Sequence, residues 1–277
     1  MQGKKFISPG AWFSMIYPGN WNEFEDTESS FLFYNPTQWS GNFRISSYKK
    51  MDKKTSMIPF GEEFTQDELK NNESSTLIKI GKLICAYSKE MFQEDGVYYV
   101  NHLWVTGIDN IAFECSFTTH RDSSLNEAED IISSLEIRKE EEKYPPEIIP
   151  ARILEITEIN ESYDWVVSEV KKQLKKDFQG AENDLMIIQK IIDSGVYPPK
   201  KKEAWLALGI AICVIIANEI DKFEWMTLID GNREAPVLQY DNNPQIIIDP
   251  MNLVWSKIKR SQPCDVVAEY KRIIESL

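Results

Sequence analysis

The sequence predicts a chain of two α+β domains, and three observations lead to this prediction. The chain has 277 residues, about twice the length of a common single domain. Apolar residues repeat with a period of two through most of the first half and with a helical period beyond residue 150. A charged and then proline-rich segment lies between them. We therefore expect domains at 1–140 and 151–277, joined by a linker at 141–150.

The first domain is expected to be a mostly antiparallel sheet. Its clearest strand is at 110–120, where alternate residues from Ile111 to Phe117 are apolar, as a half-buried strand requires. Asp95-Gly96 is a typical hairpin turn. The same kind of pattern predicts further strands at 11–17, 29–35, 42–49, 82–92 and 97–107.

Helices are expected to pack on this sheet. One is predicted at 65–72, where Thr65 and Glu68 have capping-box spacing, and one at 124–135. In the second helix, apolar residues recur on one face, which would contact the sheet.

The second domain is expected to combine helices with a short antiparallel sheet. Helical patterns lie at 166–174, 185–192, 204–217 and 266–277. Strand patterns at 223–230 and 235–240 flank Gly231, which indicates a hairpin. Asp249 followed by Pro250 is a typical helix start.

The stretch from Ala204 to Ala217 is the least polar part of the chain. It contains 14 residues without a polar side chain, whereas a membrane-spanning helix needs about 20. Lys202 and Glu203 precede it, and Asn218 follows. We interpret it as a buried core helix, and we expect no membrane span.

Two groups of residues resemble known families. SPGAWFSMIYPGNW at 8–21, the strand FECSFTT and the helix ending in IISSLEI resemble the PsbP-type fold, which a photosystem subunit and a Ran-binding nuclear factor share. The second half is similar to another bacterial domain in the positions of Gly209, Trp225, Asp230, Gly231 and Pro250. We identify the pair as the domain-of-unknown-function families 3805 and 3806. The resemblance implies a PsbP-like first domain, and it implies fold better than function.

The charge and the cysteine content indicate which partners and cofactors the protein is not expected to bind. Lys and Arg number 31 against 44 Asp and Glu, which gives a net charge of −13. Nucleic acid is therefore not an expected partner, because phosphates require clustered cations. The four cysteines are scattered, without metal-ligand spacing, and no signal peptide is apparent. We expect a cytoplasmic protein without a cofactor or a bound metal.

No catalytic motif is apparent, and one constellation provides an alternative. The chain has two histidines, His102 and His120, and neither has metal-ligand spacing. Asp230, Arg233 and Asp249 lie near predicted hairpin ends and a helix start, where they would converge on a pocket in a hydrolase. A small-ligand binding protein with an apolar cavity is a further alternative.

The leading hypothesis is a non-catalytic binding module. Better-known members of the PsbP-type fold are mostly binding or assembly factors, and an acidic surface suits a basic protein partner. Neutralisation of a toxin and assembly of a secretion apparatus are specific forms of this hypothesis. The binding residues that we predict are Trp39, which lies in the polar, turn-like segment NPTQWSGN, and Trp21, which follows the turn Pro18-Gly19-Asn20, because exposed aromatics often anchor interfaces. Packing is the alternative role for both, and the resemblance favours it for Trp21.

Overall fold

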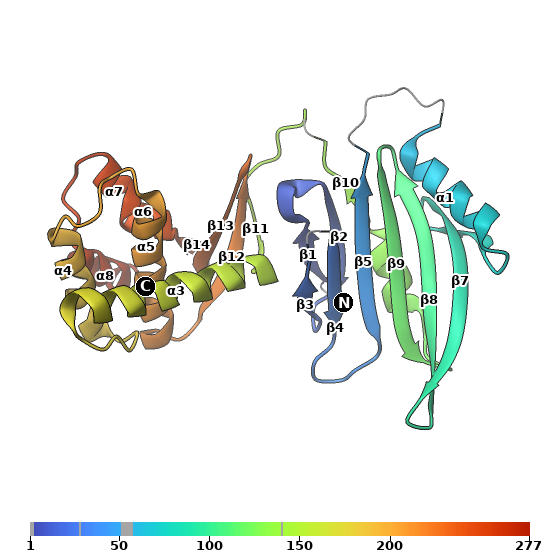
Figure 1. Ribbon diagram of the computed structural model, residues 1–277, viewed down its shortest axis with the longest axis horizontal. Coiled ribbons are helices and arrows are strands. Elements are labelled where there is room, and N and C mark those ends of the chain that lie inside the picture. The colour runs from blue at the N-terminus through green and yellow to red at the C-terminus, as the bar shows by residue number, and fades with distance from the viewer. Residues whose placement is uncertain (1–2, 28, 51–57, 140) are drawn as a thin grey trace. The chain divides into compact units, whose positions relative to one another are not determined.

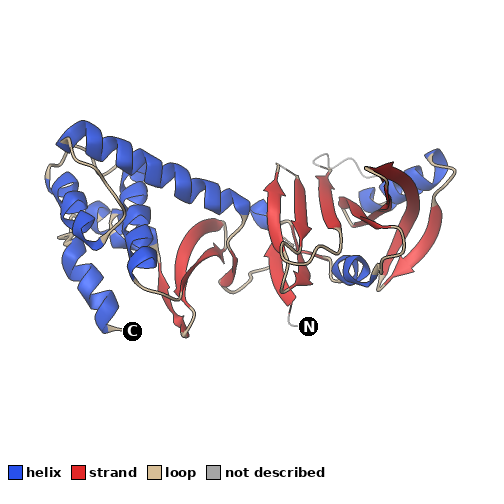
Figure 2. Ribbon diagram, turned by 90° about the horizontal axis from the view of Figure 1, so that it is seen from below, coloured by secondary structure: helices blue, strands red, loops and turns tan. Residues whose placement is uncertain are grey.

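The computed structural model describes residues 3–27, 29–50, 58–139 and 141–277. The chain divides into two compact units, Met1–Tyr144 and Pro145–Leu277. Both units combine helices with antiparallel sheets, so the predicted α+β class is confirmed. Strands predominate in the first unit and helices in the second (Figure 2).

Unit 1 contains an antiparallel sheet in the strand order β3-β4-β5-β9-β8-β7-β6 (Figure 1). A smaller sheet has the order β1-β2-β10. The larger sheet is formed by β3 (Asn22–Asp26), β4 (Ser30–Tyr34), β5 (Asn42–Lys49), β6 (Thr76–Ile80), β7 (Leu83–Glu94), β8 (Val97–Ile108) and β9 (Ile111–His120). The remaining elements are β1 (Gly3–Ile7), η1 (Pro9–Ala11), β2 (Phe13–Pro18), α1 (Phe60–Asn71), α2 (Asn126–Ser133) and β10 (Glu136–Ile137).

The core of unit 1 lies on one face of the larger sheet. Alternate residues of β9 from Ile111 to Phe117 are buried there, as predicted, together with apolar residues of α2 and β2. Helix α1 packs on the opposite face, where Gly61 meets Gly107 of β8 so closely that a Cβ at either position would contact the other backbone below 3 Å. The helix begins at Phe60, and Thr65 is inside it, where its hydroxyl donates to the Gly61 carbonyl. The predicted capping box at Thr65 is therefore wrong.

Unit 2 contains an antiparallel sheet in the order β11-β12-β13-β14 and a group of helices (Figure 1). The strands are β11 (Glu147–Pro150), β12 (Phe223–Asp230), β13 (Arg233–Tyr240) and β14 (Asn243–Ile248). The helices are α3 (Ile153–Leu174), η2 (Glu182–Asp184), α4 (Leu185–Asp193), α5 (Lys202–Glu219), α6 (Pro250–Leu253), α7 (Trp255–Lys259) and α8 (Val266–Glu275).

The apolar stretch from Ala204 to Ala217 forms most of α5, and its side chains lie at the centre of the core of unit 2. Gly209 allows this helix to lie close to the start of α6, because a Cβ at this position would lie 2.1 Å from the backbone oxygen of Pro250. Within the residues that the structure describes, no helix is both long and apolar enough to cross a membrane.

The expected linker at 141–150 is shorter than predicted at its C-terminal side. Residues Glu147–Pro150 form β11, which pairs with β12 from Glu147 opposite Ile229 to Pro150 opposite Met226. Pro145 and Pro146 precede this strand, and the apolar pair Ile148-Ile149 is too short to show a period of two. Residues 147–150 therefore resemble a linker in sequence, although they form an edge strand.

Candidate functional site

Four aromatic rings lie side by side on the sheet face that carries α1, and we call them the aromatic row: Phe92, Tyr99, His120 and Trp39. Phe92 is the cross-strand partner of Tyr99, and Tyr99 is the partner of His120. Because cross-strand partners share a face, the three rings stack, with centroids 5.6 Å and 5.2 Å apart. The indole of Trp39 meets His120 edge-on at 4.9 Å.

The indole of Trp39 is held in one orientation while it remains accessible. Its Nε1 donates to Oδ1 of Asn42 at 2.7 Å. The hydroxyl of Thr119 donates to the carbonyl of Ser40 at 2.7 Å, which fixes the next residue of the loop to β9. Trp39 is 36% exposed and Phe92 is 39% exposed. A ring that is fixed before binding loses little conformational entropy when a partner covers it.

The tip of the β7–β8 hairpin adds Val97 to the face that carries the row. Val97 is exposed, while the exposed side chains of Met91 and Tyr98 point to the opposite face, because neighbouring residues of a strand alternate between faces. The exposed charges on the same strand and turn are mainly negative: Glu90, Glu94 and Asp95 against Lys89. The site therefore offers apolar contact area with an acidic surround.

The sequence indicated only one member of the row. Trp39 is at the surface as expected, but its neighbours are distant in sequence and meet through strand register. The Asp95-Gly96 turn could have revealed part of this arrangement, since a two-residue turn makes Glu94 and Val97 partners. Counting back from that pair places Phe92 opposite Tyr99.

Trp21, the other predicted binding residue, is fully buried. Its indole stacks on Phe117 with a centroid distance of 6.2 Å, inside the core of unit 1. Burial leaves none of the ring for a partner, so the position of Trp21 corresponds to a packing role.

The structure pairs Arg233 with Asp249 by hydrogen bonds, while Asp230 is the strand partner of Arg233 across the β12–β13 turn. Nη2 of Arg233 lies 2.7 Å from both carboxylate oxygens of Asp249. The same oxygens accept from the backbone N–H of Met251 at 3.0 Å and from Nδ2 of Asn252 at 2.9 Å. Asp230 is exposed at the end of β12. Because each Asp249 oxygen already accepts two hydrogen bonds, its lone pairs are occupied, and the carboxylate caps α6.

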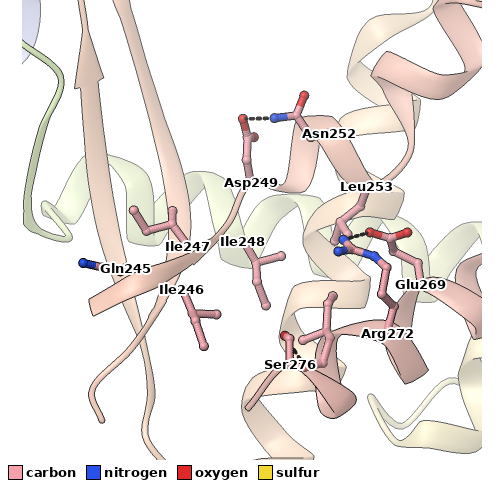
Figure 3. Close-up of a pocket in the computed structure, with 11 residues that line it drawn as sticks. Gln245, Ile246, Ile247, Ile248, Asp249, Asn252, Leu253, Glu269, Arg272 and Ser276 are labelled. Carbon is pink, nitrogen blue, oxygen red and sulfur yellow. Dashed lines mark hydrogen bonds and ion pairs between the residues drawn. The ribbon is translucent and has the colours of Figure 1, made fainter. Parts of the chain in front are cut away.

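Asp249 also borders a groove between β14 and α8, with a volume of about 260 Å³ (Figure 3). Arg233 and Asp230 do not line it. The largest charged group in the groove, Arg272, is paired with Glu269 (Figure 3). The two carboxylates that line the groove, Asp249 and Glu269, are each already paired with a cation, Asp249 with Arg233 and Glu269 with Arg272 and Lys257.

Of the two histidines, His120 is exposed in the aromatic row and His102 is buried. His102 is buried, and its Nδ1 lies 2.7 Å from the hydroxyl of Tyr87. Burial, with a further contribution from the charge of Lys89, lowers the pKa of His102, so the ring is neutral near pH 7. Among the described residues, no three or more His, Cys, Asp or Glu side chains are grouped so as to hold a metal ion.

Comparison with known proteins decides the family. Residues 1–160 match the model of the family described as Domain of unknown function (DUF3805), which is more than half of the chain. The chain belongs to the DUF3805 family. Residues 184–270 match a second family, Domain of unknown function (DUF3806). The family resemblance inferred from the sequence is therefore confirmed for both regions.

Solved structures include one that matches this chain over its whole length. A crystal structure from Bacteroides thetaiotaomicron VPI-5482 is 58% identical, covers 100% of both chains and has a TM-score of 0.92. The solution structure of cyanobacterial PsbP from Synechocystis sp. PCC 6803 is 14% identical, covers 49% of this chain and 92% of its own, and has a TM-score of 0.29. The crystal structure of LpqN, involved in cell envelope biogenesis of Mycobacterium tuberculosis, is 13% identical, covers 50% and 91%, and has a TM-score of 0.29. No curated protein matches the chain.

Proposed function

We infer that this protein is a binding module that contacts a protein partner through the aromatic row. The observation that carries the proposal is the exposure of rings that are already stacked and hydrogen-bonded in place, above all Trp39. Aromatic side chains are enriched at protein interfaces, and Trp and Tyr are enriched among the residues whose removal costs the most binding energy.

The charge of the protein favours a basic partner. The net charge is −13, and Glu90, Glu94 and Asp95 surround the hairpin tip beside the row. Opposite charge at the rim accelerates association and selects among partners. A basic protein toxin and a basic component of a secretion apparatus are the two specific forms of partner that this proposal covers.

The proposal places the protein in a reducing compartment, the cytoplasm. Its support is that Cys85, Cys115, Cys213 and Cys264 are all free thiols, as is usual for cytoplasmic proteins. Immunoblotting of cell fractions tests this location, and recovery in the envelope or periplasmic fraction would contradict it.

The function is tested by affinity capture from cells that express the protein. The bait is compared with a double variant, Trp39→Ala with His120→Ala, which removes two rings of the row. The matched control is Phe24→Ala, because Phe24 is 37% exposed and stacks on Tyr34 at 3.7 Å, at the other edge of the sheet.

We expect a stoichiometric partner with the wild-type and control baits. With purified partner, the double variant should bind about 30-fold more weakly or worse, which corresponds to about 2 kcal/mol. A partner that binds the double variant as tightly as the wild type would overturn the use of the row. The absence of any stoichiometric partner would overturn the binding proposal itself.

A further inference from the structure

Strand β7 extends well beyond the strand that covers its outer edge. Strand β6 pairs with β7 only from Leu83 to Tyr87. The next seven residues, Ser88–Glu94, pair with β8 on one side. Among the described residues, no strand pairs with them on the other side. An uncovered edge of this length is a template for pairing with another chain.

The backbone groups that face outward on this edge follow from the hairpin. Glu94 and Val97 flank the two-residue turn Asp95-Gly96, in which both residues have positive φ (48° and 82°). In such hairpins the flanking pair is hydrogen-bonded, and hydrogen-bonded pairs alternate along the ladder. The N–H and C=O groups of Lys89, Met91 and Gln93 therefore point away from β8. The carbonyl of Tyr87 has the same parity, and it accepts from Thr76 of β6, as this assignment requires.

We propose that this edge pairs with the same edge of a second copy of the chain, antiparallel, with the two-fold axis at Met91. Met91 is the middle one of the three outward-facing residues Lys89, Met91 and Gln93, all exposed, so this register uses all of them. In this register the outward-pointing backbone groups of the two copies meet. The backbone of Lys89 forms hydrogen bonds with that of Gln93 of the second copy, and the backbone of Met91 does so with that of Met91 of the second copy. The inference does not rest on the proposed function, because it is argued from the backbone edge of β7. Phe92 belongs both to this edge and to the aromatic row, so the two surfaces adjoin.

Charge selects this register over its two neighbours. With the axis at Glu90, that carboxylate would face its own equivalent. With the axis at Phe92, Glu90 would face Glu94 of the second copy. Like charges directly opposite each other destabilise a strand pair. With the axis at Met91, Glu90 faces Phe92 of the second copy, and Ser88 faces Glu94.

The contact would be weak and dependent on salt. Met91, which is 54% exposed, would be covered by its equivalent. Seven residues on each side form a small interface, and small interfaces belong to transient complexes. Each copy has a net charge of −13, so the copies repel one another at low ionic strength. We therefore expect a monomer–dimer equilibrium that shifts toward the dimer with concentration and with salt.

The test is sedimentation velocity of the full chain up to about 1 mM, at low and high salt. We expect Met91→Lys and Met91→Glu each to remove the dimer, because each places like charges on the axis. An equimolar mixture of the two variants should restore it as a heterodimer. Met91→Leu and Leu77→Lys, on the exposed face of β6, should both keep the wild-type dimer.

Several outcomes would overturn the proposal. They are a monomer at every concentration and salt, a dimer that survives both charged Met91 variants, failure of the mixture to associate, and loss of the dimer through Leu77→Lys alone. Unchanged far-UV circular dichroism and thermal midpoint show that the Met91 variants are folded. Met91→Lys retains every residue of the aromatic row, so partner capture and self-association can fail separately.

Discussion

Arg152 and Glu155 form an ion pair inside unit 2, where they are only 1% and 3% exposed. Nε of Arg152 donates to Oε2 of Glu155 at 2.9 Å, and its Nη2 donates to Glu234 at 2.7 Å. The hydroxyl of Thr227 also donates to Glu155, at 3.0 Å. Burial alone would lower the pKa of Arg152, but the hydrogen bonds and charges of Glu155 and Glu234 more than offset this and raise it.

Removing one member of the Arg152–Glu155 ion pair should destabilise unit 2 more than replacing both members with apolar residues. Arg152→Met leaves the buried carboxylate of Glu155 without its cation, so we expect a loss of about 3–5 kcal/mol in the free energy of unfolding. The double variant Arg152→Met, Glu155→Leu removes both charges and should lose less. Urea denaturation measures both. A double variant that is less stable than the single one would contradict this account.

Gly209→Ala should destabilise unit 2, although alanine favours helices. Helix propensity alone would gain about 1 kcal/mol, but the new Cβ would lie 2.1 Å from the Pro250 carbonyl oxygen. We expect a net loss of about 2 kcal/mol by urea denaturation. Gly231→Ala is the comparison, because no atom lies within 4 Å of its Cβ and only its φ of +59° is unfavourable. It should cost about 1 kcal/mol, and an equal or larger loss there would argue against a steric cause at Gly209.

Trp21 and Trp39 should differ sharply in their effect on stability. Trp21→Ala empties a fully buried site and should cost about 3–5 kcal/mol. Trp39→Ala removes a ring at the surface and should cost less than about 1 kcal/mol. Thermal unfolding of the two variants checks this. Similar losses at both positions would mean that Trp39 is part of the fold rather than available for binding.

Glu169 should make unit 2 more stable at neutral than at acid pH. Hydrogen bonds from Tyr197, Gln173 and Lys172 lower the pKa of Glu169 from 4.5 to about 2. Because the folded-state pKa is depressed, the contribution is fully present above pH 4.5 and is lost as the pH falls toward 2. Glu169→Gln should therefore be less stable than the wild type at pH 7, by about 1 kcal/mol.

The pH dependence of that difference is the decisive measurement. Urea midpoints of the wild type and Glu169→Gln should converge between pH 4.5 and pH 2. Tyr197→Phe removes the donor that contributes most and should narrow the difference at pH 7. A difference that is constant over this range would rule out the ionised carboxylate as its origin.

The sequence predicts the fold best where a residue's own neighbours decide its structure. Strand β9 follows from its alternation, and α5 follows from its apolar run with charged ends. Strand β6 was not predicted, because most of its residues are exposed and no alternation marks it. Strand β1 was not predicted either, since two lysines occupy its centre. Both strands exist because a longer neighbour offers hydrogen bonds.

In the candidate site, too, only the feature that depends on local sequence could be predicted. Trp39 could be picked out because its segment is polar and turn-like. The other rings of the aromatic row read as ordinary strand residues, and only pairing among three strands brings them together. Trp21 also follows a turn, but its ring turns inward to Phe117. The local sequence does not predict whether a side chain points toward or away from a sheet formed by distant segments.

Strand β11 has a practical consequence for producing unit 2 by recombinant expression. A fragment that begins at residue 151 would lack Glu147–Pro150 and leave one side of β12 without its hydrogen-bonding partner. Such bare edges recruit other chains and promote aggregation. A fragment that begins at Pro145 keeps the strand and the residues that lead into it. It should remain in solution at concentrations at which the shorter fragment precipitates.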